Sequence, residues 1–560
     1  MLHTRGTLLT IDIGERTWET TAIDDVLERF IGGRGAATKL AHDRVPFDVD
    51  PLGEENRVYI SSGPLQTSQT SFTGRMNATS VSPLTNGIAS TNAGGFVSRN
   101  FVDTGHAVVE VVGSSDDLLA LHVTDEGVEF EEVPDLTEAT VKATTAAMNE
   151  RHGLEAENLI TVGPAGENLV RYASLMTSNS RAFGRGGLGA VLGSKGVKTL
   201  SFEGDARPTV ELPDGAVGGE IHRDAATEDH IMKRQGTTSG VDMKNDMDEF
   251  SLPTQYFERM EFDEGVEGIN GDAVESKKYK KGTCSNCAFA CKLPTRDEET
   301  GIETEGPEYE TVFAFGSTLC IDDIVSVMKS NELCDDLGMD TVSAGVTVGA
   351  YLKSEDRFGD SELVHELLEK IAHREGIGDM LAEGVDRIHD ELGVTNWTSK
   401  GLEFPGHDGR ALHGRGLGYA TSNRGADHMY SKIHNLEYSG EVHPKGLDGK
   451  APIVAELENL KAVNDSAVLC KFSKAHMTEE RYERLFGVDY ETLLEAGSRV
   501  VELERHFNNK RGFDRSDDAL PFELEGLEDA LDEYYELRGW TNDGVVPDDQ
   551  VAGVSEQAAD

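Results

Sequence analysis

The chain has 560 residues, and its 102 aspartates and glutamates outnumber 52 lysines and arginines, which gives a formal net charge of -50 at pH 7. This charge excludes nucleic acid as a partner, because phosphate neutralisation requires a basic surface. The length allows about two to four domains and a large buried core. The acidic residues are spread along the whole chain, which indicates a surface adapted to concentrated salt, since at about 1 M salt the screening length falls to about 3 Å. An ordinary acidic enzyme is the alternative, although a charge of -50 is extreme for one.

Two observations argue against a membrane or secreted protein. No apolar run approaches the roughly 20 residues that a membrane-spanning helix needs. The first residues lack the charged region, apolar core and cleavage site of a signal peptide. We therefore expect a cytoplasmic protein in a reducing compartment, where cysteines stay free to bind metal.

The first part of the chain, residues 1–208, predicts a β-rich domain. Short apolar runs bounded by turn residues, such as 57–62 and 106–113, are typical of strands. Between the runs lie segments rich in Gly, Arg and Asn, which we interpret as loops around an anionic ligand, because glycine admits backbone N–H groups and arginine matches phosphate oxygens. For any one of them an ordinary tight turn is the alternative. These segments are 74–77, 91–95, 163–168 and 180–190.

The remainder predicts two mainly helical domains, 209–400 and 401–560, because helical periodicity and charged faces dominate from about residue 209. The predicted fold class is therefore α+β. Asp322 is expected to cap a helix that ends at Gly338. The last residues, 545–560, have the composition of a frayed acidic tail.

Three cysteines lie within eight residues, Cys284, Cys287 and Cys291, in a C-x2-C-x3-C pattern, although the whole chain has only six. Grouped thiolates suit a soft metal centre, and the spacing favours an iron–sulfur cluster. A structural zinc site is the main alternative, but it usually adds a second C-x2-C pair or histidines. A radical enzyme using S-adenosylmethionine would show the reverse spacing, and six cysteines do not make a disulfide framework.

The fourth thiolate must come from elsewhere, and an internal similarity favours Cys470 over Cys320 and Cys334. The segments Asp335-Asp-Leu-Gly-Met-Asp340 and Asp465-Ser-Ala-Val-Leu-Cys470 share one pattern, and each ends a predicted helix. This similarity indicates two equivalent elements for two equivalent halves of a ligand. Cys320 and Cys334 are then small buried residues.

Two further segments carry groups suited to catalysis. Glu305-Gly-Pro-Glu-Tyr-Glu310 follows the cysteines and can bring Glu308 and Glu310 close to them. A glutamate buried beside a metal centre is a candidate general base, and a solvated surface loop is the alternative. The segment 406–428 is rich in Gly, His and Arg and ends at His428.

Taken together, these motifs resemble the aldehyde ferredoxin oxidoreductase family, whose members carry tungsten, or sometimes molybdenum, on two pterin cofactors. The resemblance runs nearly end to end and includes Gly32-Gly-Arg-Gly35, Ser82-Pro-Leu-Thr-Asn-Gly87 and Leu537-Arg-Gly-Trp540. It implies that the β-rich domain is a saddle under the pterins and that the two helical domains cover it.

The resemblance also implies roles for individual residues. The residues expected to hold the pterins or their phosphates are Arg75, Asn92, Gly94, Arg181, Ala182, Gly184 and Arg185, with Asp335, Met339 and Asp340 at one pterin and Asp465 and Leu469 at the other. A Mg2+ between the phosphates is expected on backbone carbonyls such as those of Asn92 and Ala182. The implied ligands of a [4Fe-4S] cluster are Cys284, Cys287, Cys291 and Cys470.

The implied activity is the oxidation of an aldehyde to a carboxylate. Glu310 would orient or deprotonate the attacking water, and His428 would hydrogen-bond an oxygen of the substrate or of the metal centre. Electrons would leave through the cluster to ferredoxin, and the family is compatible with a homodimer. The alternatives are the same cofactors acting on a sugar aldehyde or reducing a carboxylate, or a zinc-stabilised binding protein without enzymatic activity.

The chain departs from the family pattern at several positions. Val468 stands where the motif usually has glycine, and Tyr430 replaces a lysine that contacts one pterin. Lys329 stands where some members have a glutamate that ligates an iron between subunits. His365 matches the histidine of that site, but without the carboxylate no bridging metal is predicted.

Overall fold

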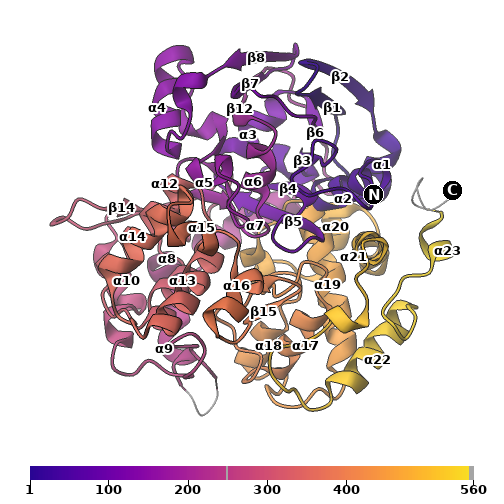
Figure 1. Cartoon of the computed structure of the whole chain (residues 1–560). Coiled ribbons are helices and arrows are strands. Elements are labelled where there is room, and N and C mark those ends of the chain that lie inside the picture. Colours follow the sequence, from indigo (N-terminus) through magenta and orange to yellow (C-terminus); the bar gives the residue numbers. More distant parts are fainter. Residues whose placement is uncertain (247–249, 554–560) are drawn as a thin grey trace.

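The computed structural model describes residues 1–246 and 250–553. Its first part contains two six-stranded sheets, which lie together in Figure 1. The first sheet has the order β2-β1-β6-β3-β4-β5 and is built from β1 (Thr7–Asp12), β2 (Thr17–Ala22), β3 (Val58–Ser61), β4 (Arg75–Val81), β5 (Ile88–Gly94) and β6 (His106–Val112). The second has the order β11-β10-β9-β12-β7-β8 and is built from β7 (Leu119–Val123), β8 (Val128–Glu132), β9 (Leu159–Val162), β10 (Leu175–Thr177), β11 (Arg181–Phe183) and β12 (Val197–Phe202).

One apolar core joins the two sheets, because buried residues of both, such as Ile60 and Ile160, belong to one cluster. Helices cover the remaining faces of this part. They are α1 (Asp24–Phe30), α2 (Gly33–Arg44), α3 (Val97–Asp103), α4 (Val141–His152), α5 (Pro164–Glu167) and α6 (Leu188–Gly193).

The rest of the described chain is mainly helical and forms two groups beside the sheets in Figure 1. The first group contains α7 (Val217–Thr227), α8 (Met232–Gln235), α9 (Val241–Lys244), α10 (Gly271–Lys277), α11 (Tyr309–Phe315), α12 (Ile324–Leu337), α13 (Thr341–Glu355), α14 (Ser361–Ala372), α15 (Ile377–Leu381) and α16 (Val385–Leu392), with the short strands β13 (Thr295–Arg296), β14 (Glu303–Thr304), β15 (Thr398–Ser399) and β16 (Leu402–Glu403). The second contains α17 (His413–Thr421), α18 (Ile433–Ser439), α19 (Lys450–Ser466), α20 (Glu479–Phe486), α21 (Tyr490–Lys510), α22 (Leu527–Arg538) and α23 (Asp548–Val551). The α+β prediction, a β-rich part followed by helices, is confirmed.

The two similar segments that the sequence revealed are similar in structure too. Gly338 and Val468, at the fourth position of each, both have a positive φ, 80° and 54°. At the sixth position, the N–H of Asp340 donates to the carbonyl of Tyr172 (3.0 Å), and the N–H of Cys470 donates to that of Phe72 (2.7 Å). Each segment therefore ends a helix, α12 or α19, and fixes it to the β-rich part.

Val468 has a left-handed backbone conformation like that of Gly338 in the first segment. A β-branched residue in this region is strained by roughly 1–3 kcal/mol. Its side chain is almost wholly buried, and it approaches the backbone of Gly63. Burial of the isopropyl group, about 1.5–3 kcal/mol, offsets the strain.

All four predicted loops contain regular structure: 163–168 includes helix α5, 180–190 includes strand β11 and the start of α6, and the other two lie largely in strands. Residues 75–77 and 91–94 lie in β4 and β5, which pair antiparallel with Arg75 opposite Gly94. Both strands lack apolar alternation because their buried polar side chains bond to one another, as when the Asn77 amide donates to Ser90 Oγ at 2.6 Å. Alternation is expected only where one face of a strand meets solvent.

Two smaller predictions also fail. The cap of α12 is Asp323 rather than Asp322, because the Asp323 carboxylate accepts from the N–H groups of Val325 and Ser326. The described part of the acidic tail is ordered, since Val551 is buried and Asp548 contacts Lys510 at 2.9 Å. Residues 554–560 lie outside the described part of the chain. The composition of this tail shows its acidic residues, but it does not show that apolar residues such as Val551 are buried and anchor it.

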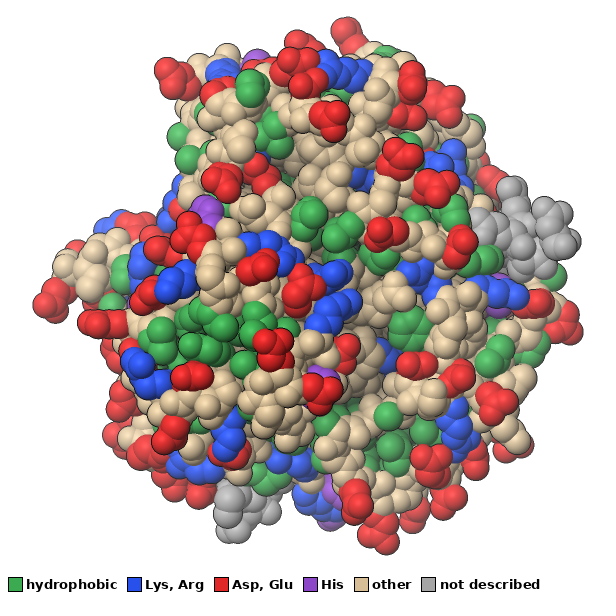
Figure 2. Space-filling view, in the orientation of Figure 1, with side chains coloured by type: hydrophobic (Ala, Val, Ile, Leu, Met, Phe, Trp, Pro, Cys, Tyr) green, Lys and Arg blue, Asp and Glu red, His purple; other side chains and the backbone are tan. Residues whose placement is uncertain are grey.

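In the described ranges, no single helix is long and apolar enough to cross a membrane, although the bent pair 309–319 and 324–337 meets that criterion by length and composition. The surface is rich in acid, and Figure 2 shows aspartate and glutamate side chains over the whole visible face.

Candidate cofactor and active site

A cavity of about 840 Å³ lies where the β-rich part meets both groups of helices. Its walls come from β5, β11, the start of α11, the end of α12, and the segments 405–440 and 465–475. Among the described residues, ten lysines and arginines line it, against seven aspartates and glutamates. In a chain of net charge -50 this local excess of cations predicts an anionic ligand.

Most residues predicted to hold the cofactor line this cavity, and they come from distant parts of the chain. They are Arg75, Asn92, Gly94, Arg181, Ala182, Gly184, Arg185, Asp335, Met339, Asp340 and Asp465. Leu469 does not line it, because its side chain is buried in the apolar cluster behind the wall. Its N–H donates to the carbonyl of Asn464 at 2.7 Å, which closes the end of α19.

The donor set fits a large phosphate-bearing group. Arg181 Nη1, Arg185 Nε and Asn92 Oδ1 are buried and have no hydrogen-bond partner among the described residues. Buried polar atoms are rarely left unpaired, so such atoms around a cavity indicate a ligand. At Gly94 an added Cβ would lie 3.1 Å from Cys284 Sγ, so glycine keeps this wall open.

Asn92 and Ala182, whose carbonyls are expected at the magnesium ion, both line this cavity. The Asn92 carbonyl accepts a hydrogen bond from Arg75 Nη2 at 2.6 Å and keeps a second lone pair. Ala182 lines the same cavity from β11. The arrangement is compatible with a cation held between two phosphates.

The two equivalent aspartates have opposite electrostatic environments. Burial raises the pKa of Asp335 to about 7, and its Oδ2 accepts a hydrogen bond from the Asn331 amide at 2.9 Å. Burial acts in the same direction at Asp465, but the charges of Lys461 and Arg34 outweigh it and hold the pKa below its usual value. The two halves of the ligand site are therefore similar in backbone and different in charge.

The structure brings the predicted cluster cysteines together. Cys284, Cys291 and Cys470 lie in the cavity wall, and Cys287 packs into the adjoining apolar cluster with Cys291 and Cys470. Burial, and then the nearby Cys470, raises the pKa of both Cys287 and Cys291. Grouped thiols in an apolar setting suit metal bonding, since a metal replaces the proton.

The other two cysteines lie apart from this group. Cys334 is fully buried within α12, and Cys320 lies 3.8 Å from Arg259 Nη2. Neither lines the cavity in the described chain. Geometry therefore favours the choice of Cys470 as the fourth thiol.

Glu310 has the environment of a proton acceptor. It belongs to the first turn of α11, and its Oε2 accepts the N–H of Gly406 at 2.8 Å. Its Oε1 is buried and lies 3.2 Å from His407 Nε2 and 3.8 Å from His428 Nε2, but neither ring has hydrogen-bonding geometry to it. Burial raises the pKa of Glu310 to about 7.

Glu308, the other glutamate of this segment, is a different kind of group. The Lys292 ammonium ion pairs with it and holds its pKa far below the usual value. A permanently ionised and paired carboxylate is a poor base near neutral pH. Of the two predicted glutamates, Glu310 is thus the one poised to exchange protons.

His407 and His428 lie beside Glu310 in the cavity wall, and His434 stacks on His407. The rings of His407 and His434 are stacked with centroids 4.3 Å apart, and the ring of His428 lies 5.6 Å from that of His407. Burial lowers the pKa of all three well below the usual value, so they are neutral. The Nδ1 atom of His428 is buried without a partner, and a neutral imidazole can donate or accept there.

Several cavity residues were missed by sequence reasoning. His407 lies in the Gly/His/Arg-rich segment 406–428. Lys292 and Lys471 each directly follow a predicted cluster cysteine, and this position could have identified them. Lys244 on α9 had no signal. Its ammonium lies over the rings of Tyr309 and Tyr438, 4.3 and 5.1 Å from their centroids.

The departures from the family pattern are accommodated locally. The Tyr430 ring lies 3.7 Å under the Arg34 guanidinium, and its hydroxyl donates to the Ser90 carbonyl at 3.0 Å. Lys329 pairs with Glu332 at 3.1 Å, and His365 Nε2 lies 3.1 Å from the carbonyl of Ser326.

A cation-lined cavity bounded by grouped thiols and a buried base is typical of an oxidoreductase with a large anionic cofactor. Comparison with known families is consistent with this class. The models "Aldehyde ferredoxin oxidoreductase, N-terminal domain" and "Aldehyde ferredoxin oxidoreductase, domains 2 & 3" match residues 8–204 and 216–552. The chain belongs to the aldehyde ferredoxin oxidoreductase family, a family of tungsten-containing oxidoreductases, and membership implies a tungsten–pterin cofactor.

The chain is 33% identical over 578 residues to the tungsten-containing aldehyde ferredoxin oxidoreductase of Pyrococcus furiosus, covering 94% of both chains. The same values hold for that of Thermococcus kodakarensis. It is also 26% identical to an aliphatic sulfonate oxidoreductase, WOR-like subunit, of Pyrococcus furiosus, over 89% of this chain and 85% of the relative. The solved active-site complex BamBC of benzoyl coenzyme A reductase has the same fold, with a TM-score of 0.83 at 21% identity, covering 98% of this chain and 96% of that one.

Proposed function

We propose that this chain oxidises aldehydes to carboxylates at a tungsten, or molybdenum, bis-pterin centre and passes the electrons through a [4Fe-4S] cluster to ferredoxin. The observation that carries the proposal is the position of Glu310. Its carboxyl group, with a pKa of about 7, faces neutral histidines inside the cation-lined cavity. A buried base of this pKa suits proton abstraction near neutral pH.

The residues described above would hold the cofactors. Arg75, Arg181 and Arg185 would bind pterin phosphates, with Mg2+ between them on carbonyls such as those of Asn92 and Ala182. Asp335 and Asp465 would hydrogen-bond the two pterins, and Met339, Asp340 and Leu469 would shape their sites. When bound, the metal–pterin group supplies a two-electron acceptor. Cys284, Cys287, Cys291 and Cys470 would ligate the cluster.

The reaction consumes one aldehyde and one water and yields one carboxylate, three protons and two electrons. Glu310 takes a proton from the water through Oε1, while the N–H of Gly406 holds Oε2 in place. His428 hydrogen-bonds the aldehyde oxygen and so stabilises the charge that develops there. The surrounding side chains exclude bulk water, which strengthens both interactions.

A cluster held by these thiols would lie in the wall of the cavity that also holds Glu310, and it would supply an exit for the electrons. A cluster of this kind passes electrons singly, so each turnover reduces two ferredoxin molecules by one electron each.

The test combines elemental analysis with an activity panel. Purified protein should contain tungsten or molybdenum and iron, and it should reduce a viologen dye with aldehydes. The panel includes sugar aldehydes and aliphatic sulfonates, because one relative bears the latter name. Glu310→Gln should abolish turnover and keep the metal content, while the exposed Glu303→Gln serves as control. Metal-replete protein that oxidises no aldehyde, or an active Glu310→Gln variant, would contradict the proposal.

A further inference from the structure

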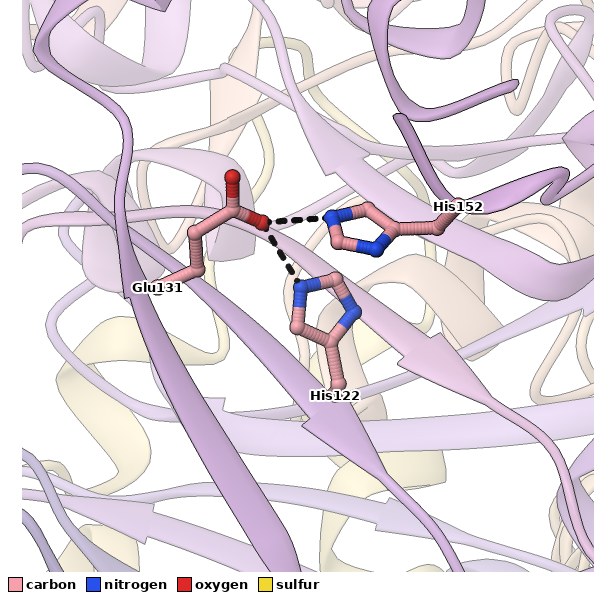
Figure 3. Close-up of side chains that lie close together, drawn as sticks. All are labelled: His122, Glu131 and His152. Carbon is pink, nitrogen blue, oxygen red and sulfur yellow. Dashed lines mark hydrogen bonds and ion pairs between the residues drawn. The ribbon is translucent and has the colours of Figure 1, made fainter. Parts of the chain in front are cut away.

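Outside the cavity, two histidines and one glutamate converge at the outer edge of the second sheet (Figure 3). His122 lies on β7, Glu131 on β8, and His152 is the last residue of α4. The Nε2 atoms of His122 and His152 lie 3.0 and 2.8 Å from the same oxygen, Oε2 of Glu131. The three potential ligand atoms all lie within 4.8 Å of one another, and none of these residues lines the cavity.

The fold produces this arrangement. His122 pairs with Glu129 and Ala120 pairs with Glu131 in the antiparallel register, so His122 and Glu131 are diagonal neighbours on one face of the sheet. Helix α4 packs on that face through the buried Met148 and ends at His152. The carbonyls at the end of a helix carry partial negative charge, which favours a cation there.

Neighbouring groups hold the ligands in place. Nδ1 of His122 lies 2.9 Å from Ser201 Oγ on β12, which directs Nε2 towards Glu131. A hydroxyl can donate or accept, so it permits the tautomer in which Nε2 carries no proton. Arg151 Nη1 binds the other glutamate oxygen, Oε1, at 3.1 Å and leaves Oε2 to the imidazoles. Arg151 is also paired with Asp135, which offsets its charge.

We propose that His122, Glu131 and His152 form a binding site for a divalent cation of the Zn2+ class, which ties the end of α4 to β7 and β8. Two imidazoles and one carboxylate suit Zn2+, Ni2+ or Co2+ rather than Mg2+ or Ca2+. With bonds of about 2.1 Å, ligand atoms of such a site lie about 3.0–3.4 Å apart, close to the separations from Oε2. The side chains are 12%, 24% and 38% exposed for His122, Glu131 and His152, so water can complete the coordination.

The test uses the holoenzyme with Zn2+ as the probe. Protein is treated with EDTA, its tungsten and iron are measured to show that they remain, and zinc uptake is followed by equilibrium dialysis. We expect one equivalent of Zn2+ per chain. Affinity should fall at least about 10-fold in His152→Ala and Glu131→Gln, and Ser201→Ala should weaken it about 10-fold through the orientation of His122.

The control is His443→Ala, which removes an exposed histidine elsewhere and should leave zinc uptake unchanged. Amide exchange gives a second readout, since zinc should slow exchange in 148–152 and 128–132 of the native protein but not of His152→Ala. No uptake by the native protein, or unchanged uptake by His152→Ala and Glu131→Gln, would overturn the proposal and leave a hydrogen-bonded cluster. Aldehyde oxidation should be unaffected by these variants, so this test is independent of the proposed function.

Discussion

Oε1 of Glu310 lies 3.8 Å from Nε2 of His428, and no described residue donates a hydrogen bond to this oxygen. The two side chains come from segments more than one hundred residues apart, yet both are largely shielded from solvent and line one cavity. In the mechanism that we propose, the gap between them leaves the base and the imidazole available to water and aldehyde instead of to each other. Catalytic contacts of this kind close only when substrate is bound.

We expect kcat/KM for aldehyde oxidation to rise with pH and to level off above about 7. Burial raises the pKa of Glu310 to about 7, and only its ionised form can take a proton. Below this pKa the active fraction falls about tenfold per pH unit. The facing histidines stay neutral, because burial holds their pKa values well below the usual one. A pH profile of kcat/KM for the native enzyme checks this prediction. An acidic limb of the profile with an apparent pKa near 4 would contradict it.

Lys244→Met should move this limb to higher pH. The Lys244 ammonium favours the ionised form of Glu310, and Lys471 and Arg185 act in the same direction. Burial lowers the pKa of Lys244 itself to about 8, so it is mainly charged where the limb falls. Methionine keeps the contacts with Tyr309 and Tyr438 and removes the charge. The matched control is Lys281→Met, which removes an exposed lysine and should leave the pH profile unchanged. An unchanged profile in Lys244→Met would show that the Lys244 charge does not affect the pKa of Glu310.

The two similar segments show what the sequence could predict. Their shared pattern identified two helix ends that border one cavity, and the positive φ at Gly338 and Val468 confirms that their backbones are similar. A glycine would have signalled this conformation at both positions, but the valine at position 468 conceals it. Burial dominates at Asp335, whereas the charge environment of Asp465 depends on Lys461, one turn earlier, and on Arg34 from the β-rich part. The last of these is a tertiary contact that no local pattern records.

The cavity shows what the sequence could not predict. Lys244 reaches it from a short helix without a motif, and His407 is one of many polar residues in its segment. Strands β4 and β5 were mistaken for loops, because their polar residues satisfy one another inside the sheet. Motifs identify residues whose chemistry is unusual, such as grouped cysteines. Residues that reach the cavity only through tertiary folding carry no local motif, so the three-dimensional structure is needed to identify them.

Cys470→Ser should remove the iron–sulfur cluster. Its thiol is the one from outside the C-x2-C-x3-C segment that lies with the other three. We expect loss of iron and of the brown colour, with loss of dye reduction. Cys334→Ser and Cys320→Ser are matched controls that should keep both, since these cysteines lie apart from the group. Iron analysis and an absorption spectrum decide the matter, and full iron content in Cys470→Ser would exclude this residue as a ligand.

The stability of the protein should rise with salt. A net charge of -50 makes the compact state repel itself, and the Debye length falls from about 10 Å at 0.1 M to about 3 Å at 1 M salt. Screening also weakens exposed ion pairs, but each contributes only about 0–1 kcal/mol, so the repulsion dominates. Thermal inactivation should therefore slow from 0.1 M to 1 M KCl. Sucrose at equal osmolarity should not reproduce the effect if charge is the cause, whereas equal or faster inactivation in KCl would show that the acidic surface needs no salt.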